Sequence, residues 1–165
     1  MGIEFARGPV MRYIILILFF VVSVPGWVIA GENKLTVEQE LKDYFFAAAR
    51  LNDVLLLKEF VGAGFPVDVT NTKGYTALMI ATYHGNTQAF DYLVSQNANT
   101  CVADQKGNTA LMAAIFRGEF SLAKKLLSYD CDAKHKNKAG NSAVEFAQVF
   151  GREQILMLLN RRNGF

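Results

Sequence analysis

The sequence predicts an all-α solenoid of about four stacked helix pairs, and three observations carry this prediction. The chain is self-similar at a spacing of 33 residues, at which Gly74, Gly107 and Gly140 coincide. Apolar residues recur at helical spacing within each copy. Glycine, asparagine and aspartate separate the copies, and these residues favour turns. A fixed period of this length is typical of stacked supersecondary units that bury their apolar flanks against each other.

The first thirty residues predict an export signal. Arg7 and Arg12 precede the uncharged run 14–24, and a proline–glycine pair then interrupts the apolar stretch. This order is typical of a secretory signal peptide over residues 1–30, with cleavage expected after Ala30. A retained anchor is the alternative, because the apolar stretch approaches the ~20 residues that span a bilayer.

Export would place the mature chain in the periplasm, without a membrane attachment once the signal has been removed. Met1 and Met11 are both compatible with the start of the signal. About 135 residues remain after cleavage, which suits one domain, and we expect a monomer.

The mature chain is nearly neutral. Removing Glu4, Arg7 and Arg12 with the leader changes the formal net charge from +2 to +1. This balance predicts neither nucleic-acid binding nor attraction to an anionic membrane surface. The basic run 134–138 is a candidate contact for an acidic partner, with an ordinary solvated charged loop as the alternative.

The mature chain contains two cysteines, Cys101 and Cys131, in a compartment that permits disulfides. Stacked units lie about 10 Å apart, whereas bridged Cα atoms lie within about 7 Å of each other. Cys131 also aligns with Ala98 of the preceding copy, which is a small residue. The spacing therefore favours a packed thiol, and a disulfide remains the alternative.

One copy of the repeat shows the order of its parts. Asp104 to Gly107 predicts a turn, Thr109 suits a helix N-cap, and residues 111–116 suit a short helix. Gly118 suits the end of that helix, and a second helix is expected over residues 119–129. Each unit is therefore a turn followed by two antiparallel helices.

The unit resembles the ankyrin repeat. Its T-P-L-H-x-A-A-x-x-G pattern is visible in Thr76-Ala-Leu-Met-Ile-Ala-Thr-Tyr-His-Gly85 and Thr109-Ala-Leu-Met-Ala-Ala-Ile-Phe-Arg-Gly118, although alanine replaces the proline. The resemblance implies an ankyrin-repeat solenoid with short β-hairpin-like turns. Within a domain of residues 31–165, the repeats are expected at about 37–66, 71–103, 104–136 and 137–162.

The hydrophobic core is expected from residues that recur at helical spacing. These are Phe45, Phe46, Leu56, Phe60, Leu78, Leu93, Leu111, Leu126, Phe146 and Leu159. Catalytic chemistry is not indicated, because His84 and His135 lie outside any metal or nucleophile motif. We therefore expect no enzymatic activity, no cofactor and no metal.

The resemblance also implies where a protein partner binds. In ankyrin proteins, the turn tips and the exposed side of each first helix form a concave face. On this sequence, the expected partner-binding residues are Tyr75, Tyr83, His84, Asn108, Phe116, Arg117, Asn141 and Phe150. Aromatic and arginine side chains are typical interface anchors, and packing within the fold is the alternative for Phe116 and Phe150.

The expected function is a periplasmic adaptor that acts through another protein. The chain is similar to small exported bacterial ankyrin proteins that accompany catalase and support peroxide resistance, and this role is implied by resemblance alone. An immunity protein that neutralises a toxin delivered to the periplasm is the alternative. An exported effector that acts on host proteins is a third class.

Overall fold

The computed structural model of the chain describes residues 33–129, 131–132 and 134–163. The chain divides into two units, one ending at Val37 and the other beginning at Glu38. The second unit contains the repeats. The predicted signal peptide and its cleavage after Ala30 lie outside the described residues. Within the described residues, no helix combines the length and the apolar character needed to cross a membrane.

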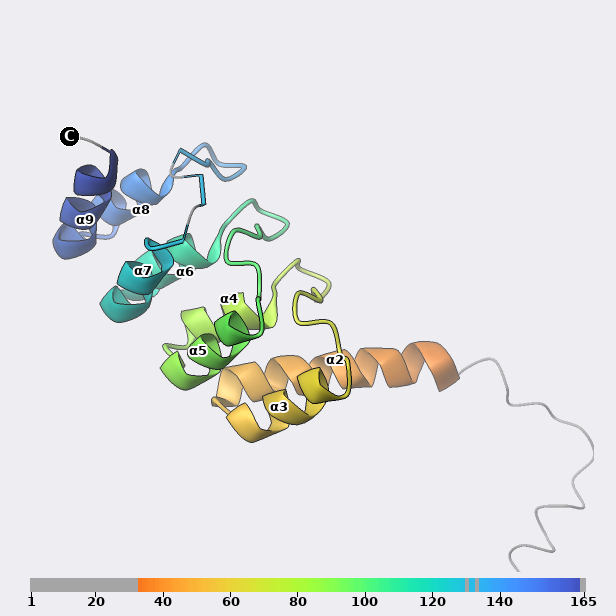
Figure 1. Cartoon of the computed structure of the whole chain (residues 1–165). Helices are drawn as coiled ribbons and strands as arrows, with labels where there is room; N and C mark the ends of the chain where they lie inside the picture. Colours follow the sequence, from red (N-terminus) through yellow and green to blue (C-terminus); the bar gives the residue numbers. More distant parts are fainter. Residues whose placement is uncertain (1–32, 130, 133, 164–165) are drawn as a thin grey trace, which may run out of the picture. The chain divides into compact units, whose positions relative to one another are not determined.

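The described residues form helix pairs, which follow one another along the second unit (Figure 1). The helices are α2 Asn33–Leu51, α3 Val54–Gly62, α4 Ala77–Tyr83, α5 Thr87–Ser95, α6 Ala110–Arg117, α7 Phe120–Leu126, α8 Ala143–Val149 and α9 Glu153–Asn163. The only β-type pairing in this described part is an isolated bridge between Ala103 and Thr109. The prediction of an all-α architecture is confirmed, although α2 begins four residues before the predicted boundary at residue 37.

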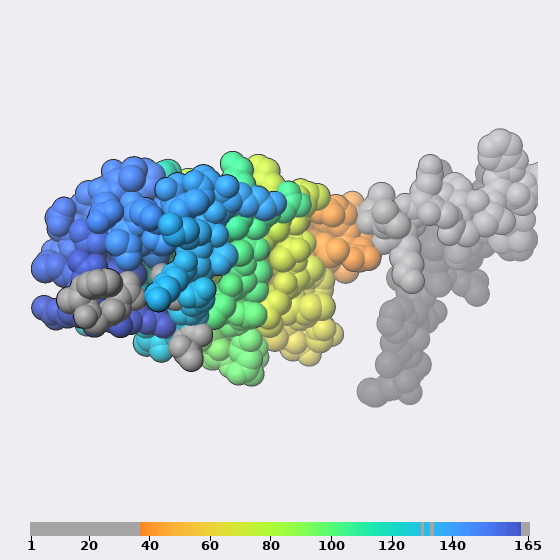
Figure 2. Space-filling model, turned by 90° about the horizontal axis from the view of Figure 1, so that it is seen from above, coloured from red at the N-terminus to blue at the C-terminus, as the bar shows by residue number. Residues whose placement is uncertain are grey.

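The helices stack by equivalent position. The first helices α4, α6 and α8 pack against one another, and α5 and α9 pack against the second helices α3 and α7 respectively. Figure 2 shows the resulting succession of bands across the surface, from yellow to blue. Each repeat therefore buries its flanks against its neighbours, as the period predicts.

Most of the predicted core is buried. Fully buried members are Phe45, Phe46, Leu78, Leu93, Leu126 and Leu159. The remaining members, Leu56, Phe60, Leu111 and Phe146, are partly buried and pack against that core. The apolar stripe is therefore continuous through the repeats, but its edges reach the surface.

Each first helix after the turn begins at an equivalent hydroxyl. The side chains of Thr76, Thr109 and Ser142 accept hydrogen bonds from the backbone N–H three residues later. At Ser142, the Glu145 carboxylate also accepts from the Ser142 N–H, which completes a capping box. The cap expected at Thr109 is confirmed, and it recurs at the 33-residue period.

Helix α7 ends earlier than predicted. It stops at Leu126, whereas the sequence favoured a helix to residue 129. The Ser128 N–H and the Tyr129 N–H each donate to the carbonyl three residues earlier, so the chain changes from α-helical bonding to tighter turns after Leu126. The Arg162 guanidinium of α9 donates to the carbonyls of Leu127, Tyr129 and Cys131. The early end is therefore held by the following helix pair.

Side chains from one repeat cap the helix ends of the repeat before it. Asn86 Nδ2 donates to the carbonyls of Ala49 and Arg50 at 2.9 and 2.7 Å, at the end of α2. Arg152 donates to the carbonyls of Ile115 and Phe116 at 3.0 Å each, at the end of α6. The last carbonyls of a helix have no partner within the helix, so these contacts satisfy them across the repeat boundary.

The structure contradicts the favoured packed thiol, because Cys101 and Cys131 form a disulfide with a Cα–Cα distance of 5.3 Å. The 10 Å estimate applies to equivalent positions, and these two are not equivalent. The residue equivalent to Cys131 is Ala98, and Cys101 lies three residues further along the segment that leads to the next repeat. The spacing of equivalent positions therefore does not apply to this pair, and their Cα atoms lie within bridging distance.

Removing the disulfide should destabilise the protein. The bridge closes a chain segment with a sequence separation of 30 residues, and loop closure of that length corresponds to about 3.6 kcal/mol. We expect Cys101→Ser with Cys131→Ser to lose about this much free energy of unfolding in urea denaturation. Reduced wild-type protein should match the variant. Equal unfolding midpoints for oxidised protein and variant would contradict the bridge.

The capping box at Ser142 should make the free energy of unfolding depend on pH in the acid range. Hydrogen bonds from Ser142, followed by those from Lys136, lower the pKa of Glu145 from its ordinary value of 4.5 to about 2. Because the folded-state pKa is the lower one, the stabilisation is present above pH 4.5 and is lost as the pH falls towards 2.

We expect Glu145→Gln to lower the melting temperature at pH 6 and to reduce the loss of stability between pH 4.5 and 2. Glu59→Gln, at an exposed position in the interior of α3, is the control and should lose stability in acid as the wild type does. An unchanged acid profile in Glu145→Gln would show that the capping box does not contribute.

Candidate protein-binding groove

Three hairpin turns between the helix pairs share one internal hydrogen-bond pattern. The side-chain oxygens of Asn71, Asp104 and Asn137 each accept two backbone N–H groups, two and four residues later. The three residues lie 33 positions apart, and such local bonds fix the turn without any other part of the fold. The tips therefore have the same conformation and present equivalent positions in the same direction.

Neighbouring hairpins are also bonded to each other. The Gln105 N–H donates to the Lys73 carbonyl at 3.0 Å, and the Lys138 N–H donates to the Lys106 carbonyl at 2.9 Å. This approach requires glycine at Gly74, where φ is +80° and an added Cβ would lie 2.8 Å from the Gln105 backbone nitrogen. The hairpins therefore form a continuous row along one edge of the solenoid.

The last turn of the first helices supplies the opposite wall. Arg50, Tyr83 and Phe116 occupy equivalent positions at the ends of α2, α4 and α6. The Tyr83 and Phe116 rings stack with centroids 6.2 Å apart, and Phe150 meets Phe116 edge-on at 4.9 Å. Tyr83 and Phe116 are 40% and 41% exposed. This aromatic row is therefore ordered by ring contacts but remains accessible.

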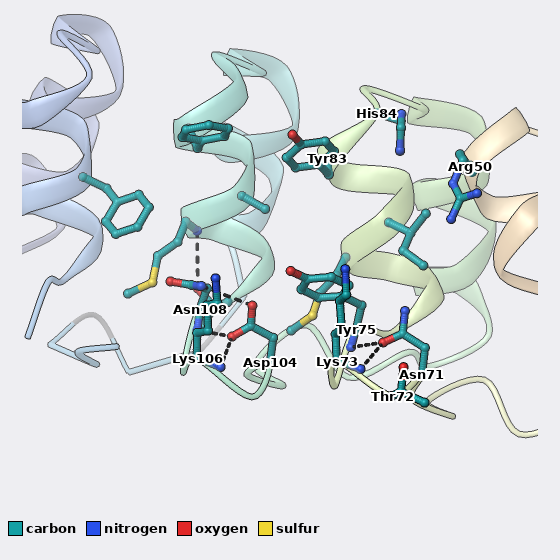
Figure 3. Close-up of a pocket in the computed structure, with 17 residues that line it drawn as sticks. Arg50, Asn71, Thr72, Lys73, Tyr75, Tyr83, His84, Asp104, Lys106 and Asn108 are labelled. Atoms are coloured by element: carbon teal, nitrogen blue, oxygen red, sulfur yellow. Dashed lines mark hydrogen bonds between the residues drawn. The ribbon is translucent and has the colours of Figure 1, made fainter. Parts of the chain in front are cut away.

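Hairpins and helix ends enclose a groove of about 650 Å³ (Figure 3). Tyr75, Lys73, Lys106 and Asn108 lie on the hairpin side, and Tyr83, His84 and Arg50 lie on the helical side. Met79 and Met112, from α4 and α6, line the space between the two sides. The groove thus combines an apolar floor with polar and aromatic rims, a composition typical of binding sites.

Cations outnumber carboxylates in the lining. Arg50, Lys73 and Lys106 line the groove, and the described residues provide no ion pair for any of them. Asp104 is the one lining carboxylate among the described residues. It is buried and accepts bonds from the Lys106 and Asn108 N–H groups and from Asn108 Nδ2. The accessible charge of the groove is therefore positive.

Burial and nearby positive charge both lower the pKa of His84. Desolvation is the largest cause that lowers the pKa of His84 below its ordinary value of 6.5, and the charges of Arg50 and Arg117 lower it further. A nearby positive charge disfavours the imidazolium form. His84 is therefore held neutral to a lower pH than a free imidazole.

The eight residues expected at the partner face are placed in three ways. Those that line the groove are Tyr75, Tyr83, His84, Asn108 and Phe116. Arg117 and Phe150 do not line it but contact residues that do: Arg117 lies 5.0 Å over the Tyr83 ring and donates to the Tyr83 carbonyl, and Phe150 contacts Phe116. Asn141 closes the third hairpin through bonds with Asn137 and is not part of the lining.

The basic part of the groove was not predicted from the sequence. Arg50 aligns with Tyr83 at the 33-residue period, and Lys73 aligns with Lys106 beside the turn glycines. Comparing the copies position by position would have identified all three. The basic run 134–138 does not supply this charge, because its lysines do not line the groove and Lys136 pairs with Glu145 at 3.3 Å.

Among the described residues, the lining of the groove shows no pairing of a base with a nucleophile. Its histidine, His84, makes a ring contact with Tyr83 and has no carboxylate or nucleophile as a hydrogen-bond partner among the described residues. Within the same part of the chain, no group of three or more histidine, cysteine or acidic side chains is placed to hold a metal ion. The arrangement suits recognition of another molecule.

Comparison with known proteins agrees with the repeat architecture. The family model described as "Ankyrin repeats (3 copies)" matches residues 45–139. Over 80 residues, the chain is 36% identical to the phosphocholine transferase AnkX of Legionella pneumophila. That match covers 48% of this chain and 8% of the transferase, so the chain corresponds to a small part of that enzyme.

Replacing Arg50 should change the titration of His84. We expect Arg50→Gln to raise the pKa of His84, because it removes one of the two cations that lower it. NMR titration of the imidazole signals measures this pKa directly. Lys124→Gln changes an exposed lysine outside the groove and should leave the titration unchanged. An identical His84 pKa in wild type and Arg50→Gln would contradict the described electrostatics.

Proposed function

Because the chain belongs to the ankyrin-repeat family, we propose that it is a protein–protein interaction module of the periplasm that binds a partner in the groove. Ankyrin repeats imply binding to another protein. One observation carries the choice of this groove: Tyr83 and Phe116 are stacked and 40% and 41% exposed on its wall. Large exposed rings at the centre of a concave surface are typical of interface anchors.

The disulfide supports a location outside the cytosol. Disulfides persist in oxidising compartments and are rare among reduced cytosolic proteins, and Cys101 and Cys131 are bridged. A periplasmic location also agrees with the signal peptide expected over residues 1–30. Cell fractionation combined with thiol alkylation tests the location: the mature chain should appear in the osmotic-shock fluid with both thiols blocked. A cytosolic chain with free thiols would contradict the location.

The partner is proposed to be a protein of the oxidative-stress defence, with a catalase as the first candidate. This part of the proposal rests on the resemblance to exported ankyrin proteins that accompany catalase. An immunity protein that neutralises a periplasm-delivered toxin is the competing proposal. An adjacent catalase gene supports the first, and an adjacent secreted-toxin gene supports the second. In either case the module binds without chemistry of its own.

Replacing the exposed aromatic pair should abolish partner capture. We expect Tyr83→Ala with Phe116→Ala to reduce capture at least tenfold, because truncating central aromatic anchors typically costs 2 kcal/mol or more, about 30-fold. Capture is measured by pull-down from the periplasm of the native host, with quantitative mass spectrometry. Helical content should be unchanged, since both side chains lie at the surface.

Tyr44→Ala with Phe120→Ala is the matched control. It removes the same two side-chain types, 61% and 37% exposed, from positions that do not line the groove. Capture by the control should equal that of the wild type. Equal capture by all three proteins would remove the groove from the proposal.

A further inference from the structure

The chemistry of the groove defines the kind of segment that it can accept. Within the part of the chain that the structure describes, its accessible charges are Arg50, Lys73 and Lys106, which form no ion pair there, and its single carboxylate is buried in the Asp104 turn. A protein segment with carboxylates would find partners here, whereas a basic segment would meet like charge. The mature chain is close to neutral overall, so this positive character is local to the groove.

The cations lie on both rims, and apolar groups lie between them. Lys73 and Lys106 occupy equivalent positions on adjacent hairpins, and Arg50 lies across the groove at the end of α2 (Figure 3). Met79 and Met112 line the space between the two rims. A ligand that matches this pattern carries negative charges at its edges and an apolar surface against the floor.

The wall changes character along the solenoid. Arg50 stands at the position occupied by Tyr83 and Phe116 in the next two repeats, and Phe146 lines the groove from α8. The helical wall is therefore basic near α2 and aromatic near α8, whereas Lys73 and Lys106 place further cations along the hairpin rim. This pattern gives a bound chain a preferred direction, with a carboxylate at Arg50 and an apolar side chain at the aromatic end of the wall.

We propose that the groove binds an acidic peptide segment of the partner protein, with carboxylates at Arg50, Lys73 and Lys106 and an apolar side chain against Phe116. This inference rests on the proposed function, since it specifies the chemistry of the segment that the module recognises. Selective binding of such a segment needs both the charged and the apolar contacts, because the cations alone would bind any polyanion.

The span of the groove sets the length of the segment. Packed helices lie about 8–10 Å apart, and the lining extends from Arg50 in the first repeat to Phe146 in the fourth. Three such steps are about 24–30 Å. An extended chain covers about 3.3 Å per residue, so about eight residues fill the groove.

A peptide fits these features better than a nucleic acid. Single strands are bound by continuous basic tracks combined with rings on which successive bases stack. Here the lining contains three cations and the apolar side chains of Met79 and Met112 in place of a continuous basic track. Alternating acidic and apolar side chains meet this pattern directly.

Selection from a random twelve-residue peptide library displayed on phage tests the inference. Wild-type protein and the Tyr83→Ala with Phe116→Ala variant are selected in parallel, so that only peptides enriched on the wild type are scored. We expect these peptides to carry net negative charge and at least one aromatic or aliphatic residue. Neutral or basic enriched peptides would overturn the inference while leaving the proposed function intact. Enrichment that is equal on both proteins would instead remove the proposed function.

Charge reversal supplies the second test, with the most enriched peptide as a fluorescent probe. Lys73→Glu with Lys106→Glu should weaken its binding about tenfold or more in fluorescence polarisation, and replacing the peptide's acidic residues by their amides should have a similar effect. Lys124→Glu with Arg161→Glu makes the same change of net charge at exposed positions outside the lining, and should bind within about twofold of the wild type. Equal losses in the two double variants would attribute the effect to overall charge and overturn the inference.

A labelled single-stranded oligothymidine of twelve nucleotides separates the peptide from a nucleic acid. We expect the wild-type protein to bind it at least tenfold more weakly than the selected peptide. Tighter binding of the oligonucleotide, lost in Lys73→Glu with Lys106→Glu, would overturn the assignment to a peptide.

Discussion

The structure depends on contacts between neighbouring repeats, which bury the apolar flanks of each repeat and provide hydrogen-bond donors for the carbonyls at its helix ends. A single turn-helix-helix unit leaves an apolar flank exposed and the carbonyls at its helix ends without partners. Neighbouring repeats bury the flanks, and Asn86, Arg117 and Arg152 donate to the last carbonyls of α2, α4 and α6. The donors differ in residue type, but each reaches the end of the preceding first helix. Apolar and polar requirements are therefore met at the same interface.

This constraint also orders the groove. Bonds between hairpins hold Lys73 and Lys106 in one row, because the backbone of each tip pairs with that of the next. Stacked first helices hold Tyr83 beside Phe116, and Arg117 lies over the Tyr83 ring while bonding the Tyr83 carbonyl. The side chains that would meet a partner are thus positioned by the contacts that join the repeats. The hairpin backbone and the aromatic rings therefore have little conformational freedom to lose on binding, which favours affinity.

The period of the sequence was sufficient to predict the fold, since a 33-residue register with recurring glycines and hydroxyl caps describes a repeat directly. The same period predicted that Tyr83 and Phe116 lie on one face, because equivalent positions in successive repeats share an environment. Local departures from the period were harder to predict. The disulfide was missed because Cys101 and Cys131 are three residues out of register, and the early end of α7 depends on Arg162 from α9. Arg50 was missed because a basic residue replaces an aromatic one at that position.

The sequence does not contain the identity of the partner, because a recognition groove specifies complementary chemistry and not a particular protein. AnkX illustrates the same point, since the matched segment is 8% of a phosphocholine transferase. Repeats of this kind occur in proteins of different activity, and function follows from the site presented on the fold. Here the site is an apolar floor between basic and aromatic rims.

Site-specific photo-crosslinking in living cells tests the central claim most directly. A photo-reactive benzoyl-phenylalanine would replace Phe116 in the groove or, as the comparison, Phe120 on α7 outside it. We expect a covalent adduct with a second protein from position 116 and none from position 120. Adducts from position 120 alone, or from both positions equally, would contradict it.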